Sequence, residues 1–250
     1  MGLGHSPRIV TDGLVLCLDA ANARSYPGTG TTWTDMKGGN NGTLANSPTF
    51  NNNGSLSHFS LSGSNDNIKI AESSTLNFQP TQPFSVFCWF KKDAFGGSNV
   101  GPIIANMKSS SPYQGWDIWC QSSSLIAMHL ISSWNGNAIK IEAYHDYSKI
   151  SYAGFTYDGS CPADSTESLN SVNFYRDGLL NTTNKALNNT NGFDSSSESI
   201  SYPAGQQTAI GSRHNAEYTS SYVYSTHIYT RALTSDEVRQ NFEATKGRYE

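Results

Sequence analysis

Short stretches rich in apolar residues recur through the middle of the chain at intervals of about ten residues, and turn-forming residues separate them. Each stretch is long enough for one β-strand but too short for a typical helix. Many short strands of this kind, joined by turns, are typical of an antiparallel β-sandwich. The strands expected here are 103–107, 116–120, 125–131, 138–143 and 151–157.

The segment from Phe84 to Lys91 is apolar on both of its faces. Side chains alternate between faces along a strand, so Phe84 and Val86 share one face while Phe87 and Trp89 share the other. A strand of this kind belongs in the middle of a sandwich. The inward side chains of the core are expected to include Val15, Phe84, Val86 and Phe155.

One short helix is predicted after the last strand, which covers 221–229. Thr234 and Glu237 have the spacing of a capping box, in which each side chain bonds the backbone N–H of the other residue. Val238 and Phe242 follow on one helical face. The sequence therefore indicates a helix over 235–246 that packs on the sandwich.

Three segments are expected to connect these elements. The region 22–53, rich in Gly, Asn and Thr, is interpreted as a long loop that Trp33 anchors to the body. Residues 58–61 and 68–70 are interpreted as the two strands of a hairpin. The Asn- and Ser-rich region 181–198 is expected to be an exposed loop.

Composition limits the classes of protein that are compatible with this chain. It has 250 residues, of which 36% are hydrophobic, so one domain over 12–250, preceded by a docking arm over 1–11, is the expected organisation. Only 14% of residues are charged and the net charge is -4, which argues against nucleic acid as a partner. No apolar run is long enough to span a membrane. The four cysteines lack C-x-x-C spacing and are expected to be reduced thiols in the core.

Several segments together resemble the laminin G-like group of concanavalin A-like jelly rolls: GLVLCLDAAN, LSGSNDNIKI, PFSVFCWFK, SYAGFTYDGS, VNFYRDGLL, and AIGSR before STHIYTRALTSDEV. The resemblance implies an all-β fold in which two large antiparallel sheets pack face to face, one of them concave. The segment SYPGTGTTWTDMKGGNNGTL is similar to a version found in structural proteins of tailed bacteriophages and of marine bacteria. That version is placed on virion or cell surfaces.

The chain departs from the family pattern in two respects. Members often carry an acidic pair before the Y-x-R-A-L segment, where this chain has Ser225 and Thr226, so the resemblance predicts weaker metal binding. The hydrolases of the fold use an E-x-D-x-x-E strand, which is absent here. Glu142 and Asp146 are too far apart on an extended strand to act as a pair. No G-x-S-x-G or H-E-x-x-H motif occurs, and the chain is expected not to be an enzyme.

Two loop carboxylates are the candidates for a calcium site. Jelly rolls of this group often hold Ca²⁺ at a rim, where carboxylate and carbonyl oxygens bind the ion. Asp66 and Asp158 lie in such loops. The alternative is that both are turn residues whose side chains bond their own backbone.

The candidate glycan-binding residues surround a turn that carries an aromatic side chain. Trp134 lies beside Asn135 and Asn137, and a tryptophan at a turn tip is difficult to bury. Exposed aromatic rings stack on the apolar faces of sugars, while amides bind their hydroxyls. Tyr113, Tyr144 and His145 would join this site if their loops share an edge. Alternatively, Trp134 anchors its own hairpin or faces another subunit.

The leading hypothesis is therefore a non-enzymatic virion protein of a bacteriophage: a decoration, fibre or tail-associated subunit at the virion surface. It would dock on other virion proteins, and its polar loops would face solvent or a host surface glycan. A carbohydrate-binding adhesin is the second hypothesis, and a glycan-cleaving enzyme is the third. A homo-oligomer is compatible with each of them, but the sequence shows no shaft repeat that would define its size.

Overall fold

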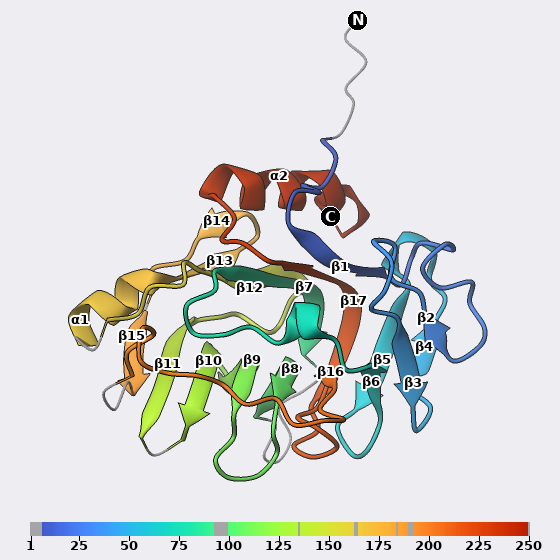
Figure 1. Cartoon of the computed structure of the whole chain (residues 1–250). Coiled ribbons are helices and arrows are strands. Elements are labelled where there is room, and N and C mark those ends of the chain that lie inside the picture. Colours follow the sequence, from blue (N-terminus) through green and yellow to red (C-terminus); the bar gives the residue numbers. More distant parts are fainter. Residues whose placement is uncertain are drawn as a thin grey trace, which may run out of the picture.

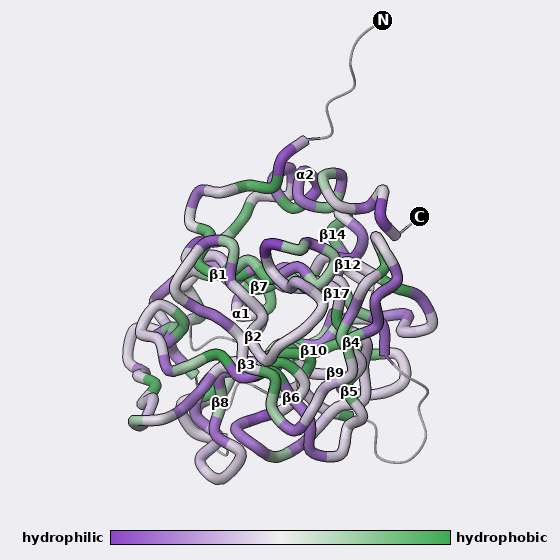
Figure 2. Tube along the Cα trace, turned by 90° about the vertical axis from the view of Figure 1, so that its right-hand side faces the viewer, coloured by the Kyte–Doolittle hydropathy of each residue, from purple (hydrophilic) through white to green (hydrophobic). Residues whose placement is uncertain are grey.

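Two antiparallel β-sheets stack face to face in the computed structural model of this chain, with one helix over the outer face of one sheet (Figure 1). The structure describes residues 7–92, 100–134, 136–162, 165–183, 185–189 and 193–249. Apolar residues concentrate along the strands, whereas polar residues dominate the turns at the periphery (Figure 2). The predicted all-β sandwich with one short C-terminal helix is confirmed.

The first sheet, sheet A, contains eight strands among the described residues. In spatial order they are β14 (Leu179–Leu180), β13 (Val172–Arg176), β12 (Ser151–Tyr157), β7 (Phe84–Lys92), β17 (Ser220–Tyr229), β5 (His58–Ser62) and β4 (Thr49–Asn51), with β1 (Leu14–Asp19) also paired to β17.

The second sheet, sheet B, contains nine strands among the described residues. In spatial order they are β15 (Ala186–Asn189), β11 (Asn137–Tyr144), β10 (Leu125–Ser133), β9 (Gly115–Ser122), β8 (Gly101–Met107), β16 (Thr208–Ile210), β6 (Asn67–Ile70), β3 (Gly42–Ala45) and β2 (Thr32–Trp33). The helices are α1 (Ser165–Ser168) and α2 (Ser235–Thr245), together with 3-10 turns at Gly54–Leu56, Ser74–Leu76, Leu169–Ser171 and Lys246–Arg248.

Strand β7 lies at the centre of sheet A, between β12 and β17, as its two apolar faces predict. Phe84 and Val86 point into the main core between the sheets, where Phe155 of β12 joins them. Val15 packs against the same core but is only half-buried, because the pairing of β1 with β17 shifts between Leu14 and Leu16. Leu16 therefore occupies the inward position more fully than Val15 does.

The outer face of sheet A is covered by α2, by the chain segment that precedes β1 and by the segment that follows the helix. Trp89 stacks on Phe242 and Tyr249, with ring centroids 5.7 and 4.1 Å away, and its Nε1 donates to Thr245 Oγ1 at 2.8 Å. The helix begins with the predicted capping box of Thr234 and Glu237. The second apolar face of β7 thus packs against a helix.

The described part of the N-terminal arm packs against α2 of its own chain. The buried Asn241 side chain accepts from the Val10 N–H at 2.7 Å, and Tyr229 Oη donates to the Val10 carbonyl at 3.1 Å. Gln240 also donates to the Arg8 carbonyl at 2.7 Å. Residues 8–10 are therefore engaged within the fold, while positions 1–6 of the proposed docking arm lie outside the described residues.

The prediction of one long loop over 22–53 was wrong, because the region contains β2, β3 and β4. Strand β3 pairs with β6, and Trp33 of β2 is fully buried with its ring 4.7 Å from that of Phe59. These strands are two to four residues long and lie at or near sheet edges, where polar side chains are tolerated. Because these strands are short and polar, the sequence showed no strand pattern for them.

The predicted hairpin over 58–70 was also wrong. Strand β5 belongs to sheet A and β6 to sheet B, so the turn between them crosses from one sheet to the other. Phe59 and Ile68 reach the same core from opposite sides. Alternation of apolar residues is identical in a hairpin and in such a crossing, so the pattern could not distinguish them.

The region 181–198 is more ordered than predicted, since β15 pairs with β11 and Phe193 is fully buried. The cysteine prediction is confirmed: all four are free and buried. Burial raises the pKa of the Cys88 thiol to about 12. No helix among the described residues has the length and apolar character needed to cross a membrane.

The ion pair at the start of α2 predicts a pH-dependent contribution to stability. Both carboxylate oxygens of Glu237 accept from Arg231, at 2.7 and 2.6 Å, and these bonds lower the pKa of Glu237 from 4.5 to about 2. A depressed carboxyl pKa stabilises the fold above the unfolded pKa, and this contribution is lost as the pH falls through the folded value. We expect Glu237→Gln to lower the free energy of unfolding by about 1 kcal/mol at neutral pH, with solvent screening taken into account.

Urea unfolding of the wild type and of Glu237→Gln measures this difference, which should shrink as the pH falls from about 5 to about 2. Glu243→Gln is the matched control, because Glu243 is also partly exposed and paired with a lysine, Lys246, but caps no helix. An equal difference across the pH range would contradict the assignment.

Candidate functional site

Three polar side chains form a row across β9, β10 and β11 on the outer face of sheet B. Asp117 pairs with His129 in the ladder, and His129 pairs with Lys140 on its other side. Their immediate neighbours, such as Ile118 and Met128, point into the main core, so the row faces the opposite way. All three are nonetheless buried, because loops and side chains cover this part of the face.

Arg213 anchors this row from the loop that follows β16. Its Nε donates to Asp117 Oδ2 at 2.7 Å and its Nη2 lies 2.5 Å from the same oxygen, while both side chains are almost completely buried. His129 Nδ1 lies 2.9 Å from Asp117 Oδ1 and 3.0 Å from Arg213 Nη2. Burial alone would raise the pKa of Asp117, but Arg213 and His129 outweigh it and lower the pKa. Asp117 is therefore held as a carboxylate.

Two tryptophans are held in place by the cations of this cluster. The Arg213 guanidinium lies 4.0 Å from the centroid of the Trp119 ring. Lys140 Nζ lies 3.5 Å from the centroid of the Trp134 ring and donates to the Trp134 carbonyl at 3.3 Å. Burial, with a contribution from Arg213, lowers the pKa of Lys140. Cation–π contacts of this kind favour one orientation of each ring.

These residues surround a cavity of about 350 Å³, which we call the aromatic pocket. Its volume is within the range of small-molecule sites. Tyr113 contributes a third ring, 5.4 Å from that of Trp134, and the exposed Glu217 contributes a carboxylate at the rim. The lining residues are Val100, Tyr113, Trp119, Gln121, His129, Trp134, Arg213 and Glu217.

The two loops beside the pocket have a strained backbone. Tyr113 has a φ of 58°, and in the second loop His214, Asn215 and Glu217 have φ values of 32°, 67° and 54°. Such left-handed conformations cost roughly 1–3 kcal/mol each for non-glycine residues and gather at functional sites. Reciprocal backbone bonds between Arg213 and Ala216, at 2.9 and 2.7 Å, hold the second loop.

Gly101, the first residue of β8, allows that second loop to pack closely on sheet B. A Cβ at this position would lie 2.1 Å from Thr219 Oγ1 and 3.4 Å from the Glu217 carbonyl oxygen. Any larger residue would push the loop away from the strand. The position of Glu217 therefore depends on this glycine.

The structure brings two of the predicted glycan-binding residues together and separates the others. Trp134 and Tyr113 both line the aromatic pocket. Asn137 is half-buried near it, and its carbonyl accepts from Ser132 Oγ at 3.1 Å. Asn135 lies outside the described residues.

Tyr144 and His145 do not belong to this site, because Tyr144 ends β11 at its far end and His145 follows it. The length of the strand places Tyr144 roughly 20 Å from Asn137. His145 is buried beside Ser151, and burial, with a contribution from Arg176, lowers its pKa to about 3. The condition that these loops share an edge with Trp134 is not met.

The two candidate calcium ligands are engaged in local hydrogen bonds. Asp66 accepts from the N–H and the hydroxyl of Ser62, and Asp158 accepts from the N–H and the hydroxyl of Ser160. These are the turn interactions that formed the alternative interpretation. Among the described residues, no group of three or more His, Cys, Asp or Glu side chains has an arrangement that could hold a metal ion.

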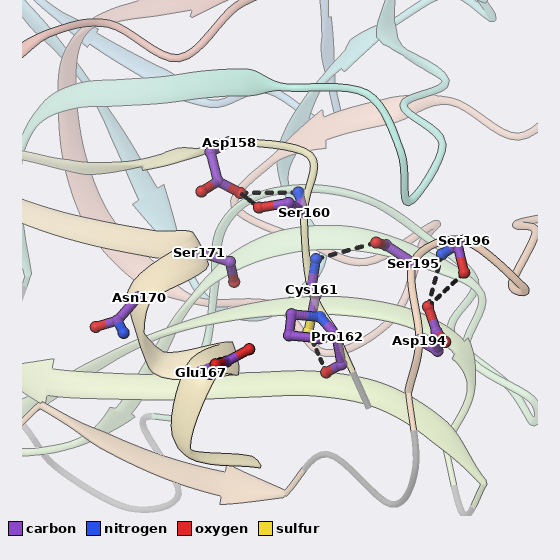
Figure 3. A pocket seen from close by; sticks show the side chains of 10 residues that line it. All are labelled: Asp158, Ser160, Cys161, Pro162, Glu167, Asn170, Ser171, Asp194, Ser195 and Ser196. Atoms are coloured by element: carbon purple, nitrogen blue, oxygen red, sulfur yellow. Dashed lines mark hydrogen bonds between the residues drawn. The ribbon is translucent and has the colours of Figure 1, made fainter. Parts of the chain in front are cut away.

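Asp158 also borders a larger hollow of about 670 Å³, shown in Figure 3. Its walls are turns and the short helix α1, and Asp194 is bonded to Ser196 in the same way as Asp158 is bonded to Ser160. None of the described residues that line this hollow is aromatic. The aromatic pocket, which combines rings with a buried charge network on a rigid sheet, is therefore the stronger candidate site.

Solved structures with a similar fold were found, but no model of a known protein family and no curated protein sequence matches the chain. The sialidase of Trypanosoma rangeli, in complex with the inhibitor DANA, has a TM-score of 0.63 at 13% identity, over 99% of this chain and 36% of the sialidase chain. The receptor-binding domain of botulinum neurotoxin type G has a TM-score of 0.59 at 17% identity, over 93% of this chain and 51% of that chain.

The binding domain of botulinum neurotoxin DC, solved in complex with rat synaptotagmin II, has a TM-score of 0.60 at 14% identity, over 93% of this chain and 52% of that chain. This chain thus spans about a third to a half of the length of these proteins. At such low identities the likeness shows the β-sandwich fold alone.

The buried ion pair predicts a large effect on stability. Replacing Asp117 by Ala leaves the Arg213 guanidinium buried without its main partner, and breaking such a pair costs about 3 to 5 kcal/mol. Chemical denaturation of the variant measures this loss. Asp158→Ala, which removes only bonds within an exposed turn, should cost about 1 kcal/mol or less. Equal losses in the two variants would contradict the role assigned to the Asp117–Arg213 pair.

Proposed function

We propose that this chain is a non-enzymatic β-sandwich module that binds carbohydrate in the aromatic pocket. The observation that carries the proposal is the grouping of Tyr113, Trp119 and Trp134 around one cavity. Aromatic rings present flat apolar surfaces that match the C–H faces of pyranose rings. Gln121 and Glu217 supply polar groups for hydroxyls in the same cavity.

The arrangement of carboxylates supports binding rather than hydrolysis. A glycosidase needs two carboxyl groups, one of which is protonated at neutral pH because its environment raises its pKa. At the aromatic pocket Asp117 has a lowered pKa and is engaged with Arg213, so it is not a proton donor. Glu217 is the only other carboxylate among the described residues at the pocket.

The fold is compatible with this use. The names of the structural neighbours include a sialidase and receptor-binding domains of toxins, and those activities belong to the named proteins. The concanavalin A-like, laminin G-like relationship that the sequence segments imply is part of our proposal.

Replacing Trp134 by Ala should weaken binding to glycans. The substitution removes the ring that Lys140 and Tyr113 contact, and losing one aromatic surface for a sugar costs about 1 to 3 kcal/mol, or roughly tenfold to a hundredfold in affinity. A glycan array, followed by calorimetry with any glycan that binds, makes the measurement.

Tyr144→Ala is the matched control, because Tyr144 is also a half-buried aromatic residue of the same hairpin but lies at its far end. An unchanged affinity in Trp134→Ala, or a wild-type protein that binds no glycan, would contradict the proposal. Circular dichroism of each variant confirms that it is folded.

A position on the surface of a bacteriophage virion is the second part of the proposal. It rests on the resemblance of the segment from Ser25 to Leu44 and on one feature of the fold. The described chain near both termini packs on the side of sheet A where α2 lies, and sheet B forms the opposite side of the sandwich (Figure 1). The aromatic pocket opens on the outer face of sheet B. Attachment through the α2 side would leave the pocket facing outward, toward a host surface glycan, with other virion proteins as partners.

Mass spectrometry of purified particles tests this placement. We expect peptides of this chain in particles freed of soluble protein by density-gradient centrifugation. Their absence from particles, together with the presence of the chain in the soluble fraction, would favour the free adhesin, with the same aromatic pocket.

A further inference from the structure

We infer that Glu217 is the group that accepts hydrogen bonds from sugar hydroxyls, and that the aromatic pocket takes neutral rather than acidic glycans. This inference rests on the proposed function and names its ligand class.

Glu217 is the exposed end of a chain of charged contacts. Its side chain is 35% exposed, and its Oε2 accepts from Arg213 Nη1 at 3.3 Å. Among the described residues, no hydrogen-bond donor engages Oε1. A carboxylate bound through one oxygen is held in a defined direction while the other oxygen remains available to hydroxyl donors.

The residues behind Glu217 fix that direction. Arg213 is only 3% exposed, is bound to the fully buried Asp117 and lies against the Trp119 ring. Glu217 itself has a φ of 54°, in a loop that Arg213 and Ala216 close by reciprocal backbone bonds. Asp117 and Arg213 therefore act as positioning residues, and Glu217 is the group that would touch the ligand.

The charges around the pocket disfavour an anionic ligand. Arg213 is the only arginine or lysine among the described lining residues, and its guanidinium is committed to Asp117 and covered from solvent. His129, which also lines the pocket, is buried and engaged with the same carboxylate. Lys140 lies against Trp134 and donates to its carbonyl. An incoming carboxylate or sulfate would meet the negative charge of Glu217 at the rim with no uncommitted cation to balance it. A neutral sugar would instead offer hydroxyl donors to that charge.

An array that pairs neutral oligosaccharides with their sialylated or sulfated counterparts tests the inference. We expect the wild type to prefer the neutral member of each pair. Glu217→Gln keeps the shape of the side chain but removes its charge, so affinity for neutral glycans should fall about tenfold and the preference over acidic ones should narrow. Glu243→Gln, which alters a carboxylate of similar exposure and pairing on α2, should leave both unchanged.

A second comparison tests the role of Arg213. Arg213→Lys keeps the positive charge but not the fork that contacts Asp117 and Glu217 together. We expect Glu217→Gln to reduce affinity less in this background than in the wild type, because Glu217 is then already poorly oriented. Equal fold-losses in the two backgrounds would contradict positioning by Arg213.

The outcomes separate this inference from the proposed function. If Trp134→Ala weakens binding while Glu217→Gln binds neutral glycans as the wild type does, the aromatic pocket is the site but Glu217 is not its hydroxyl acceptor. A wild-type preference for acidic glycans overturns the inference in the same way. If Trp134→Ala binds as the wild type does, the proposed function fails. Glu217 is exposed, so its substitution leaves the fold intact and the result is decisive.

Discussion

The fold depends on the burial of β7 on both of its faces. One face meets sheet B through Phe84 and Val86, and the other meets α2 through Trp89. A strand that is apolar on both sides cannot face water, so the sandwich needs a third layer over the outer face of sheet A. The helix, its capping box and the hydrogen bonds of Arg8 and Val10 to Gln240 and Asn241 all serve to hold that layer in place.

Within the described part of the chain no helix lies over the outer face of sheet B, and this asymmetry creates the site. The central strands of sheet B carry Asp117, His129 and Lys140 on that face, where loops rather than a helix cover them. The loops come from 108–114 and 211–219, and both have left-handed non-glycine residues. A rigid sheet thus presents a charged row, while the strained loops shape the cavity above it.

Each pattern in the sequence could predict only the feature of the structure that it reports. Alternation and spacing identified the central strands and the helix correctly, because they report burial within a single segment. They could not show that β5 and β6 belong to different sheets, since the side-chain pattern is the same in either case. Trp134 was predicted from its turn position, and Tyr113 only on the condition that its loop shares an edge with it; both line the aromatic pocket.

The remainder of the site required the register between strands. Asp117 and His129 each interrupt an apolar strand with one polar residue, and Lys140 shares its strand with Glu142; these interruptions were the signal available. Only the pairing of β9, β10 and β11 shows that the three lie side by side. Arg213 and Glu217 come from a loop roughly a hundred residues later, and nothing local in the sequence connects them to Asp117.

The buried pair of Asp117 and Arg213 is not explained by stability alone. Apolar residues of similar volume would stabilise such a position as well or better, because two charges lose their hydration on burial. What apolar residues could not do is hold the Trp119 ring by a cation–π contact and direct a carboxylate at the pocket rim. The pair is better understood as a device for orienting the groups around it. The same reasoning explains why the strained loop at Glu217 is retained, since relaxing that backbone would move the carboxylate away from the rings.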